Sequence, residues 1–595
     1  MRGSILGKLT LTLPFIAFLP VFSGHSATLM VPEVFLIAEA VNAATDGDVI
    51  SLRSVPPTIF PVSENLRPVA NNLTIEGRSG NPEDSILQAA NSAVILETSG
   101  LVNIQFESFT MENGDGIALS VFRCEEVDIH NCVVRDCTST RTPVCLLTIS
   151  DVDIRNCTFE NNVGNSEDPF LINLPGGAVA ILGNDEFDFS INIEESTFRR
   201  NSSSDTNGGA IAVYGADIVK DQHKGNFPSA PNLVAVTDCL FIENSAPEGI
   251  GGAIHMERPD NGLLFTMSGC YIADGTAQQG GGLAVDRSQG FVNLSIRDST
   301  FENNSATAGS GGGVLIYEVT SEMKGFTEDE QGVAVFIASS TIEANTASRN
   351  GGGIAIESGD HRTEYIIEDN LIIRNGSVIG SGIHIGPPTP TDIDLKLNKG
   401  FTGPDNFVLQ GRITGNRFHL NSVQELGNSF KQMKGSISLS DAVGGGLYLE
   451  DSLTDVLGNE FAFNTSFAGG GIALVRDGST VSDNLIGVPL SEASLIREGG
   501  SGGGLITSPV FSGNVALAGG GLLLVSSPDP NKGTGPPFTP PKITNNLFIR
   551  NLAILGSPMT AIRMWICGSL IQPLKDHRLI PSTSTVMRKA REQAA

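Results

Sequence analysis

A repeated pair of motifs constrains the fold of this chain more than any other feature. In each copy an apolar residue is followed three positions later by asparagine, and then by a glycine-rich segment that ends in an aliphatic residue. Phe241–Asn244 with Gly251–Ile254 is one example. The clearest copies span 198–211, 241–254, 301–314, 342–354, 461–472 and 511–522, and looser copies begin at Phe159, Tyr271, Ile372, Phe418 and Phe548.

The spacing of these copies indicates a solenoid. Phe241, Tyr271 and Phe301 follow one another at 30 residues (271 − 241 and 301 − 271). The longer gaps between other copies contain charged or proline-rich inserts such as 318–331 and 386–390. A constant period with inserts at fixed places is typical of stacked coils.

The residue types within each repeat favour a parallel β-helix. Short β-branched stretches such as 292–296 and 354–356 alternate as strands do. We expect the apolar residue to stack inside the coil and the asparagine to bond its neighbour in the next coil. The glycines would permit a tight corner and close contact between coils. The sequence therefore predicts an all-β fold, a single right-handed parallel β-helix of about 17 coils.

A second ladder is predicted two positions before the apolar residue, where small or hydrogen-bonding residues recur. The copies at Tyr271 and Phe511 depart from it, with Gly269 and Pro509. This regularity makes its cysteines buried structural thiols rather than reactive or metal-binding ones. The predicted members are Cys157, Ser196, Cys239, Ser299, Ser340, Asn370, Asn416, Asn459 and Asn546.

Four segments are predicted along the chain. Residues 1–27 have the basic start, apolar core and small-residue end of a secretory signal peptide, with an uncleaved membrane anchor as the alternative. Residues 28–80 form the N-terminal cap and first coils, and 81–555 form the repeated β-helix. Residues 556–595 form a basic tail, expected to be poorly ordered, with binding to an acidic partner as the alternative.

The start of the solenoid can be predicted in more detail. Residues 35–44 are apolar at helical spacing, whereas 49–52 and 73–77 have the pattern of strands. A short helix over the open end of the first coil would cover an exposed strand edge.

Charge and cysteine usage bound the function. The net charge of −28 argues against nucleic acid as a partner, and no apolar run predicts a transmembrane span after removal of the leader. Export would permit disulfides, while the absence of Cys-x-x-Cys gives no support for a zinc ribbon. We expect a protein that is secreted or located at the cell surface or outer membrane. The cysteines between which export would permit disulfides lie in one short stretch of the sequence: Cys124, Cys132, Cys137, Cys145 and Cys157.

The alternating F-x-x-N and G-G-[AGS]-[ILV] motifs resemble the repeat of the chlamydial polymorphic outer membrane proteins. The copies at 198–211, 241–254 and 301–314 match both halves, and the resemblance covers roughly 157–551. It implies a surface-displayed parallel β-helix with adhesion as its role. The family carries a C-terminal translocator barrel, whereas the repeats here run almost to Ala595. Anchoring in the outer membrane is therefore not predicted by the resemblance alone.

No catalytic, cofactor-binding or metal-binding residue is assigned from the sequence. The best polar constellations are Asp360-His361-Arg362 and Gly382-Ile383-His384, which lie less than one period apart. Both histidines are also explained as an exposed loop residue and a strand residue on the solvent side. Acidic loops could bind calcium weakly, but a solvated acidic face explains them as well. These acidic residues are Asp185, Glu186, Asp188, Glu194, Glu195, Glu328, Asp329, Glu330, Asp392 and Asp394.

Two hypotheses of function follow. The first is a non-enzymatic β-helix protein, an adhesin or envelope component that contacts a cell-surface or extracellular polysaccharide or protein. The alternative is a polysaccharide-active enzyme of the same fold, a lyase, hydrolase or epimerase, because paired carboxylates serve such chemistry.

Overall fold

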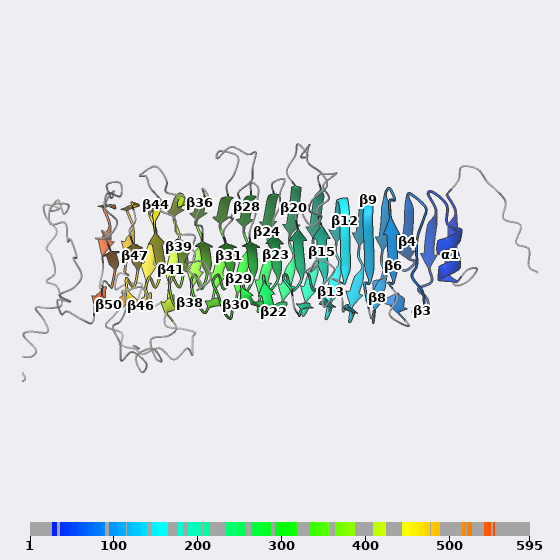
Figure 1. The fold of residues 1–595 in the computed structure, drawn as a ribbon, viewed down its shortest axis with the longest axis horizontal. Helices are drawn as coiled ribbons and strands as arrows, with labels where there is room; N and C mark the ends of the chain where they lie inside the picture. The colour runs from blue at the N-terminus through cyan, green and yellow to red at the C-terminus, as the bar shows by residue number, and fades with distance from the viewer. Residues whose placement is uncertain are drawn as a thin grey trace, which may run out of the picture.

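The chain folds as one long parallel β-helix, as the repeat predicts, and it is seen here in a computed structural model (Figure 1). Every strand pairing among the residues that the structure describes is parallel. The structure describes residues 26–553 apart from 32–35, 90–93, 115, 140–143, 165–175, 183–188, 205, 215–231, 258–262, 287–291, 318–332, 358–362, 387–408, 424–442, 476–477, 488–513, 519, 526–540 and 549–550. The predicted leader and basic tail lie almost wholly outside these residues.

Sheets B and C form two faces of the coil. In the described part of the chain sheet B has 15 strands, where about 17 coils are predicted. Sheet B comprises β3 (Thr58–Val62), β5 (Ser85–Ala89), β8 (Thr110–Glu112), β10 (Val133–Arg135), β13 (Thr158–Glu160), β17 (Thr197–Arg199), β21 (Leu240–Ile242), β25 (Tyr271–Ala273), β29 (Thr300–Glu302), β33 (Thr341–Glu343), β37 (Leu371–Ile373), β41 (Arg417–His419), β45 (Glu460–Ala462), β49 (Leu485–Ile486) and β53 (Leu547–Phe548). Sheet C comprises β11 (Thr138–Ser139), β14 (Val163–Gly164), β18 (Ser202–Ser203), β22 (Ser245–Ile250), β26 (Thr276–Gln279), β30 (Ser305–Ala306), β34 (Thr346–Ala347), β38 (Gly376–Ser377), β42 (Ser422–Val423), β46 (Thr465–Ala468), β50 (Val515–Ala518) and β54 (Leu552–Ala553).

Sheet A supplies two strands to most coils, and we call these two series A1 and A2. The long strands β9 (Leu119–His130) and β12 (Cys145–Arg155) belong to both. A1 comprises β6 (Leu96–Ser99), β15 (Val179–Leu182), β19 (Ile211–Tyr214), β23 (Ile254–Glu257), β27 (Leu283–Asp286), β31 (Val314–Tyr317), β35 (Ile354–Glu357), β39 (Ile383–Gly386), β43 (Leu447–Glu450), β47 (Ile472–Val475) and β51 (Leu522–Val525). A2 comprises β1 (Thr28–Val31), β2 (Val49–Leu52), β4 (Leu73–Gly77), β7 (Ile104–Glu107), β16 (Ser190–Glu194), β20 (Asn232–Thr237), β24 (Leu263–Ser268), β28 (Val292–Arg297), β32 (Val333–Ala338), β36 (Thr363–Glu368), β40 (Leu409–Thr414), β44 (Ser452–Leu457), β48 (Thr480–Ser482) and β52 (Lys542–Thr544).

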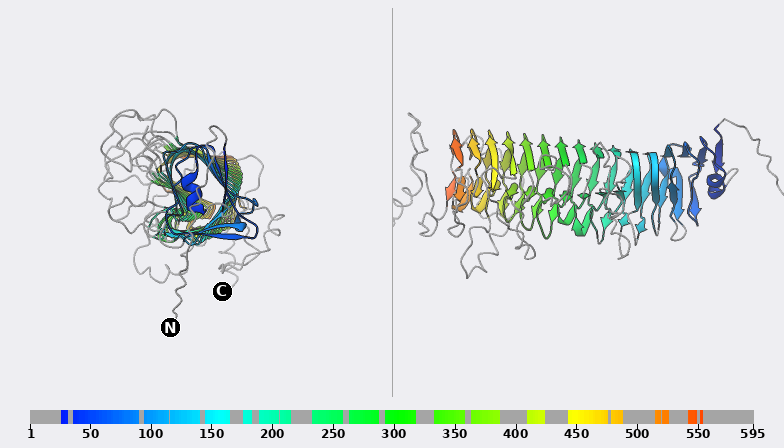
Figure 2. Two further views of the ribbon diagram at one scale, coloured as in Figure 1. Left: turned by 90° about the vertical axis from the view of Figure 1, so that its right-hand side faces the viewer. Right: turned by 45° about the horizontal axis from the view of Figure 1, so that its top comes forward.

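A short helix covers the N-terminal end of the coil. Helix α1 (Ile37–Ala43) lies across the opening when the molecule is viewed along its axis (Figure 2). Its apolar face, with Ile37, Ala40 and Val41, is buried in the main core. The helix follows β1 (Thr28–Val31) in the chain, and a 3-10 turn, η1 (Pro82–Asp84), lies further along. No helix in the described part of the chain is long and apolar enough to cross a membrane. The predicted helix and the strands at 49–52 and 73–77 are therefore present.

The glycine triplets form one corner of successive coils, and their first two positions have different roles. The first glycine has a positive φ, as at Gly311 (69°) and Gly351 (58°), which other residues adopt only with strain. The second lies against the next coil. A Cβ on Gly312 would be 2.3 Å from the carbonyl oxygen of Gly352. The second glycine is thus required by the distance between coils rather than by its own backbone angles.

The predicted apolar and asparagine ladders are both present inside the coil. The rings of Phe159, Phe198 and Phe241 stack with centroids 4.8 and 4.9 Å apart. Asn345 is fully buried, and its side-chain Nδ2 donates to the carbonyl oxygen of the earlier Phe301 and to Oδ1 of Asn375. The ladder therefore satisfies buried polar groups coil by coil, which removes the penalty of burying them unpaired.

The second ladder is also present, but the structure corrects its register at two copies. Ile272, not Tyr271, pairs with Phe241, so Cys270 belongs to this ladder and Gly269 does not. Ile486 rather than Phe511 follows Phe461, which makes Asn484 the member in that coil. Phe511 and Pro509 lie outside the described residues.

All seven cysteines in the described part of the chain are buried free thiols. Cys157 and Cys239 lie in the second ladder as predicted. Burial raises the pKa of the Cys132 and Cys137 thiols to about 12, so these thiols remain protonated and poorly nucleophilic. The clustered cysteines form no disulfide with one another here, although export would permit one.

Candidate functional site

The outer face of A1 carries side chains that point away from the main core. Along β35, Ile354 and Ile356 belong to that core, whereas Ala355 joins a separate cluster with Ala284 and Leu315. Since side chains alternate along a strand, the last residue of each A1 strand also faces outward. Glu357 is therefore directed to the outside of the coil.

The last positions of successive A1 strands form one line of tyrosine and carboxyl side chains, which we call the outer row. Strand pairing places each member beside the next, and strands are about 4.8 Å apart, so the row extends about 29 Å. Its members are Tyr214, Glu257, Asp286, Tyr317, Glu357, Gly386 and Glu450. Glu257, Tyr317 and Glu450 are half-buried and keep contact with solvent, while the other side chains of the row are buried.

A second line of outward residues lies two positions earlier in each strand. It brings His255 next to the first part of the outer row and His384 next to the last part. The spacing from the glycine triplet gives the sequence signal for both lines. Counted from the first glycine of each triplet, the fourth and sixth following residues face outward, as His384 and Gly386 do after Gly380.

Tyr214 is the first member of the outer row. Its ring lies 5.8 Å from that of His255, and the side-chain amide of Asn207 donates to its hydroxyl at 3.4 Å. Burial raises the pKa of Tyr214 well above its usual value, and the charges of Glu257 and Asp286 act in the same direction. This phenol is therefore neutral and able to donate a hydrogen bond.

Glu357 lies in the second part of the outer row and is almost completely buried, with 3% of its surface exposed. The side-chain amide of Asn350 donates to its Oε1 at 2.8 Å. Burial raises the pKa of Glu357, against smaller lowering effects from hydrogen bonds with Ser310 and Asn350 and from the charge of Arg349. The carboxyl group is thus biased toward its protonated form.

His384, Tyr448 and Glu450 converge over Gly386. The imidazole stacks on Tyr448 with centroids 5.0 Å apart, and the Tyr448 hydroxyl donates to Oε2 of Glu450 at 2.7 Å. A Cβ on Gly386 would lie 3.3 Å from Nε2 of His384 and 3.2 Å from the Cβ of Glu450. Glycine at this position therefore allows the two side chains to approach the strand closely.

The imidazole of His384 is buried without a hydrogen-bond partner in the described part of the chain, at either ring nitrogen. Burial lowers its pKa to about 3. The ring is consequently neutral at physiological pH, with one nitrogen that can donate and one that can accept.

This burial predicts a pH-dependent stability that His384→Phe removes. The unfolded histidine takes up a proton below about pH 6.5 while the folded one does not, so stability is lost as the pH falls toward 3, by on the order of 4 kcal/mol. Urea unfolding at pH 7 and pH 4 should show a smaller acid loss in His384→Phe, whose ring can still stack on Tyr448. Equal acid losses in the two proteins would contradict the buried neutral imidazole.

Most polar residues singled out in the sequence lie outside the described part of the chain. This applies to Asp360-His361-Arg362, to 328–330, to 392–394 and to 185–188. Glu194 is described, and its carboxylate lies 3.8 Å from Arg155 in an exposed pair. His384 was predicted on the solvent side of a strand; it does face outward, but it is buried.

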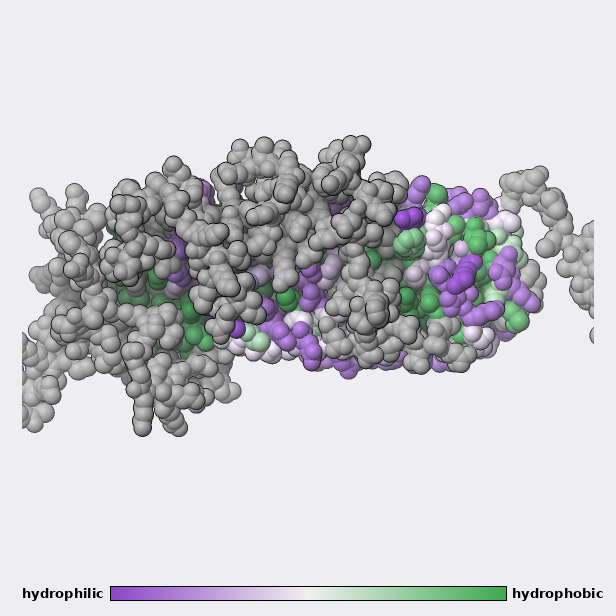
Figure 3. All heavy atoms as spheres, in the orientation of Figure 1, coloured by the Kyte–Doolittle hydropathy of each residue, from purple (hydrophilic) through white to green (hydrophobic). Residues whose placement is uncertain are grey.

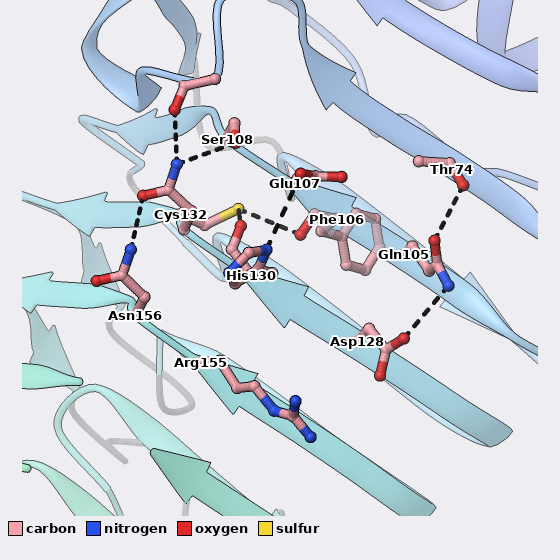
Figure 4. Close-up of polar contacts among 12 residues, drawn as sticks. Thr74, Gln105, Phe106, Glu107, Ser108, Asp128, His130, Cys132, Arg155 and Asn156 are labelled. Carbon is pink, nitrogen blue, oxygen red and sulfur yellow. Dashed lines mark hydrogen bonds and ion pairs between the residues drawn. The ribbon is translucent and has the colours of Figure 1, made fainter. Parts of the chain in front are cut away.

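A polar face near the N-terminus offers a contrast with the outer row. Hydrophilic residues are interspersed with hydrophobic ones over the first coils on the face that Figure 3 shows. In these coils Thr74, Gln105 and Asp128 form a chain of hydrogen bonds across three strands (Figure 4). Asn156 and Asn131 pair in the same way. Since these groups satisfy one another, the coil-to-coil contacts explain them without a ligand.

Among the described residues no group of three or more histidine, cysteine, aspartate or glutamate side chains is arranged to hold a metal ion. The acidic loops for which weak calcium binding was predicted lie mostly outside those residues. Calcium binding therefore stays a prediction.

No protein-family model and no curated protein matches the chain. Several solved structures are similar to it, among them the following three. A mannuronan C-5 epimerase A-module from Azotobacter vinelandii has 12% identity and a TM-score of 0.29, covering 60% of this chain and 92% of that one. A family 6 polysaccharide lyase from Pseudopedobacter saltans has 12% identity and a TM-score of 0.32, covering 70% and 98%. A mannuronic acid-specific family 6 lyase from human gut microbiota has 11% identity and a TM-score of 0.22, covering 68% and 88%.

This comparison corrects the main functional prediction from the sequence. A non-enzymatic adhesin or envelope component was expected, whereas the solved structures that the chain resembles are a polysaccharide epimerase and polysaccharide lyases. At such identities the similarity itself concerns the β-helical fold. The resemblance to the chlamydial repeat stays a prediction, since no family match tests it.

Proposed function

We propose that this protein is an enzyme that acts on a polysaccharide and that the outer row of A1 is its active site. The observation that carries the proposal is the convergence of Glu357, His384, Tyr448 and Glu450 on one stretch of that row. Buried groups with shifted pKa values that face one another outside the core are typical of catalytic sites.

The form of the outer row supports a polymeric substrate. It is straight, about 29 Å long, and repeats at about 4.8 Å, a distance close to the length of one sugar ring. The row contains two tyrosine rings, Tyr214 and Tyr317, among carboxyl groups, and sugars are bound by stacking and hydroxyl contacts of these kinds. A polymer lying along the coil axis would meet successive strands in register.

A polysaccharide substrate agrees with the predicted leader at 1–27, and we propose an exported location for the same reason. The proposed location includes display at the cell surface, as the resemblance of the repeat implies. It does not include anchoring in a membrane.

The proposal predicts turnover of at least one polymer in a panel of neutral and acidic polysaccharides that includes mannuronan. New reducing ends with ultraviolet absorbance indicate a lyase, new reducing ends alone a hydrolase, and altered residue composition without cleavage an epimerase. His384→Phe should lower the rate at least about 100-fold, while Glu126→Gln, on an exposed part of β9, should not. A wild-type chain inactive on every polymer, or a His384→Phe variant as active as wild type, would overturn the proposal.

A further inference from the structure

Two carboxyl groups flank one position of the outer row with no ionisable side chain between them. Glu357 pairs with Gly386, and Gly386 lies next to Glu450. Two strand spacings put the carboxyl groups about 9–10 Å apart. Inverting glycosidases hold their two carboxyl groups about 6.5–9.5 Å apart, while retaining enzymes hold them at about 5–5.5 Å.

The two carboxyl groups have different environments. Glu357 is almost fully buried and accepts a hydrogen bond from Asn350, whereas Glu450 is half-buried and accepts one from Tyr448. Glu450 accepts a hydrogen bond from a phenol, as a base does, whereas burial favours the protonated form of Glu357. Pairs of carboxyl groups whose environments differ in this way divide into an acid and a base.

His384 gives an independent indication of a ligand at this place. It is a buried polar side chain without a partner among the described residues, and Nε2 lies close to Gly386, the row position that separates Glu357 from Glu450. A neutral imidazole can donate to one sugar hydroxyl and accept from another. The ring therefore matches a group that carries adjacent hydroxyls.

We propose that Glu357, His384 and Glu450 form a hydrolytic centre for glycosidic bonds between uncharged sugars, with inversion at the anomeric carbon. This rests on the proposed function and narrows it to one reaction and one substrate class. The uncharged class follows from the charges around the site. A uronate carboxylate would lie between the carboxyl groups of Glu357 and Glu450, which would disfavour its negative charge. The neutral His384 beside it would supply no opposite charge. Arg349, which is exposed, is the basic side chain whose charge acts on Glu357.

The reaction balances with water as the co-reactant. Glu357 donates its proton to the glycosidic oxygen as the bond from that oxygen to the anomeric carbon breaks. Glu450 takes a proton from a water molecule whose oxygen bonds to the anomeric carbon from the opposite face. Proton exchange with solvent then restores Glu357 as the acid and Glu450 as the base. His384 binds the hydroxyls of the reacting sugar and transfers no proton.

Glu357→Gln and Glu450→Gln test these roles, with Glu126→Gln as the matched control on β9. On a neutral polysaccharide both row variants should lose at least about 1,000-fold in kcat, while the Kd for the polymer changes less than threefold. On an aryl glycoside with a nitrophenol leaving group, which needs no proton, Glu357→Gln should recover to within about tenfold of wild type, and Glu450→Gln should not. Proton NMR of the first product should show inversion.

The outcomes separate the two proposals. Unsaturated products, cleavage confined to polyuronates, retention at the anomeric carbon, or a fully active Glu357→Gln variant would overturn the hydrolytic centre and leave the polysaccharide-active enzyme standing. Failure of the wild-type chain to act on any polymer would overturn both. Circular dichroism of each variant, unchanged from wild type, would show that lost activity is not lost folding.

Discussion

Gly312→Ala should destabilise the coils around it by at least about 3 kcal/mol, at the upper end of the penalty for overpacking. An added Cβ would lie 2.3 Å from the carbonyl oxygen of Gly352 and 2.5 Å from that of Thr346. Both contacts are with backbone of the next coil, so no side-chain rotation relieves them. The two coils would have to separate, which breaks the parallel hydrogen bonds that join them.

Hydrogen exchange measures this effect coil by coil, which suits a solenoid whose repeats interact mainly with their neighbours. Amides of β30 and β34 should exchange much faster in Gly312→Ala, while those of β5 and β8 should not change. Gly458→Asn is the control, because Gly458 has a positive φ of 62° and nothing within 4 Å of the added atom, and asparagine tolerates such angles. If the two variants exchanged alike, close approach between coils would not be the reason for the second glycine.

Phe198→Ala is expected to cost about 3–5 kcal/mol, the usual range for removing a buried aromatic ring. Phe198 is fully buried and lies between two stacked rings, Phe159 and Phe241, so its loss leaves a cavity with a ring on each side. Faster hydrogen exchange in β13, β17 and β21 would report the loss. Phe122→Ala, at a residue 44% exposed, should cost less than about 1 kcal/mol. A Phe198→Ala variant as stable as Phe122→Ala would contradict the stacked core.

The fold could be predicted from the sequence because the same physical requirement returns in every coil. A buried asparagine such as Asn345 must find a partner, and it finds Asn375 one coil later. The predicted strand register was wrong where the sequence pattern is ambiguous by one residue. At Tyr271 and Ile272 either side chain could fill the apolar position, and only burial distinguishes them. The copy at 511 failed because an insert separates Ile486 from Asn514 within one motif, although Asn514 itself takes its predicted place between Asn464 and Asn551.

The candidate site could not be assembled from the sequence for a different reason. His384 was singled out, but Glu357 and Glu450 are separated from it by 27 and 66 residues (384 − 357 and 450 − 384) and share no local motif. Only strand register brings them together. The burial that shifts the pKa of Glu357 and His384 arises from tertiary packing, so residue type gives no signal of it.

The most direct test of the outer row as the active site is a crystal structure of Glu357→Gln with an oligosaccharide of the polymer that the wild-type chain turns over. We predict a sugar chain that lies along β35, β39 and β43 on the outer face of A1, with hydroxyls in hydrogen-bond contact with His384. An oligosaccharide bound instead on the outer face of sheet B or sheet C would contradict it.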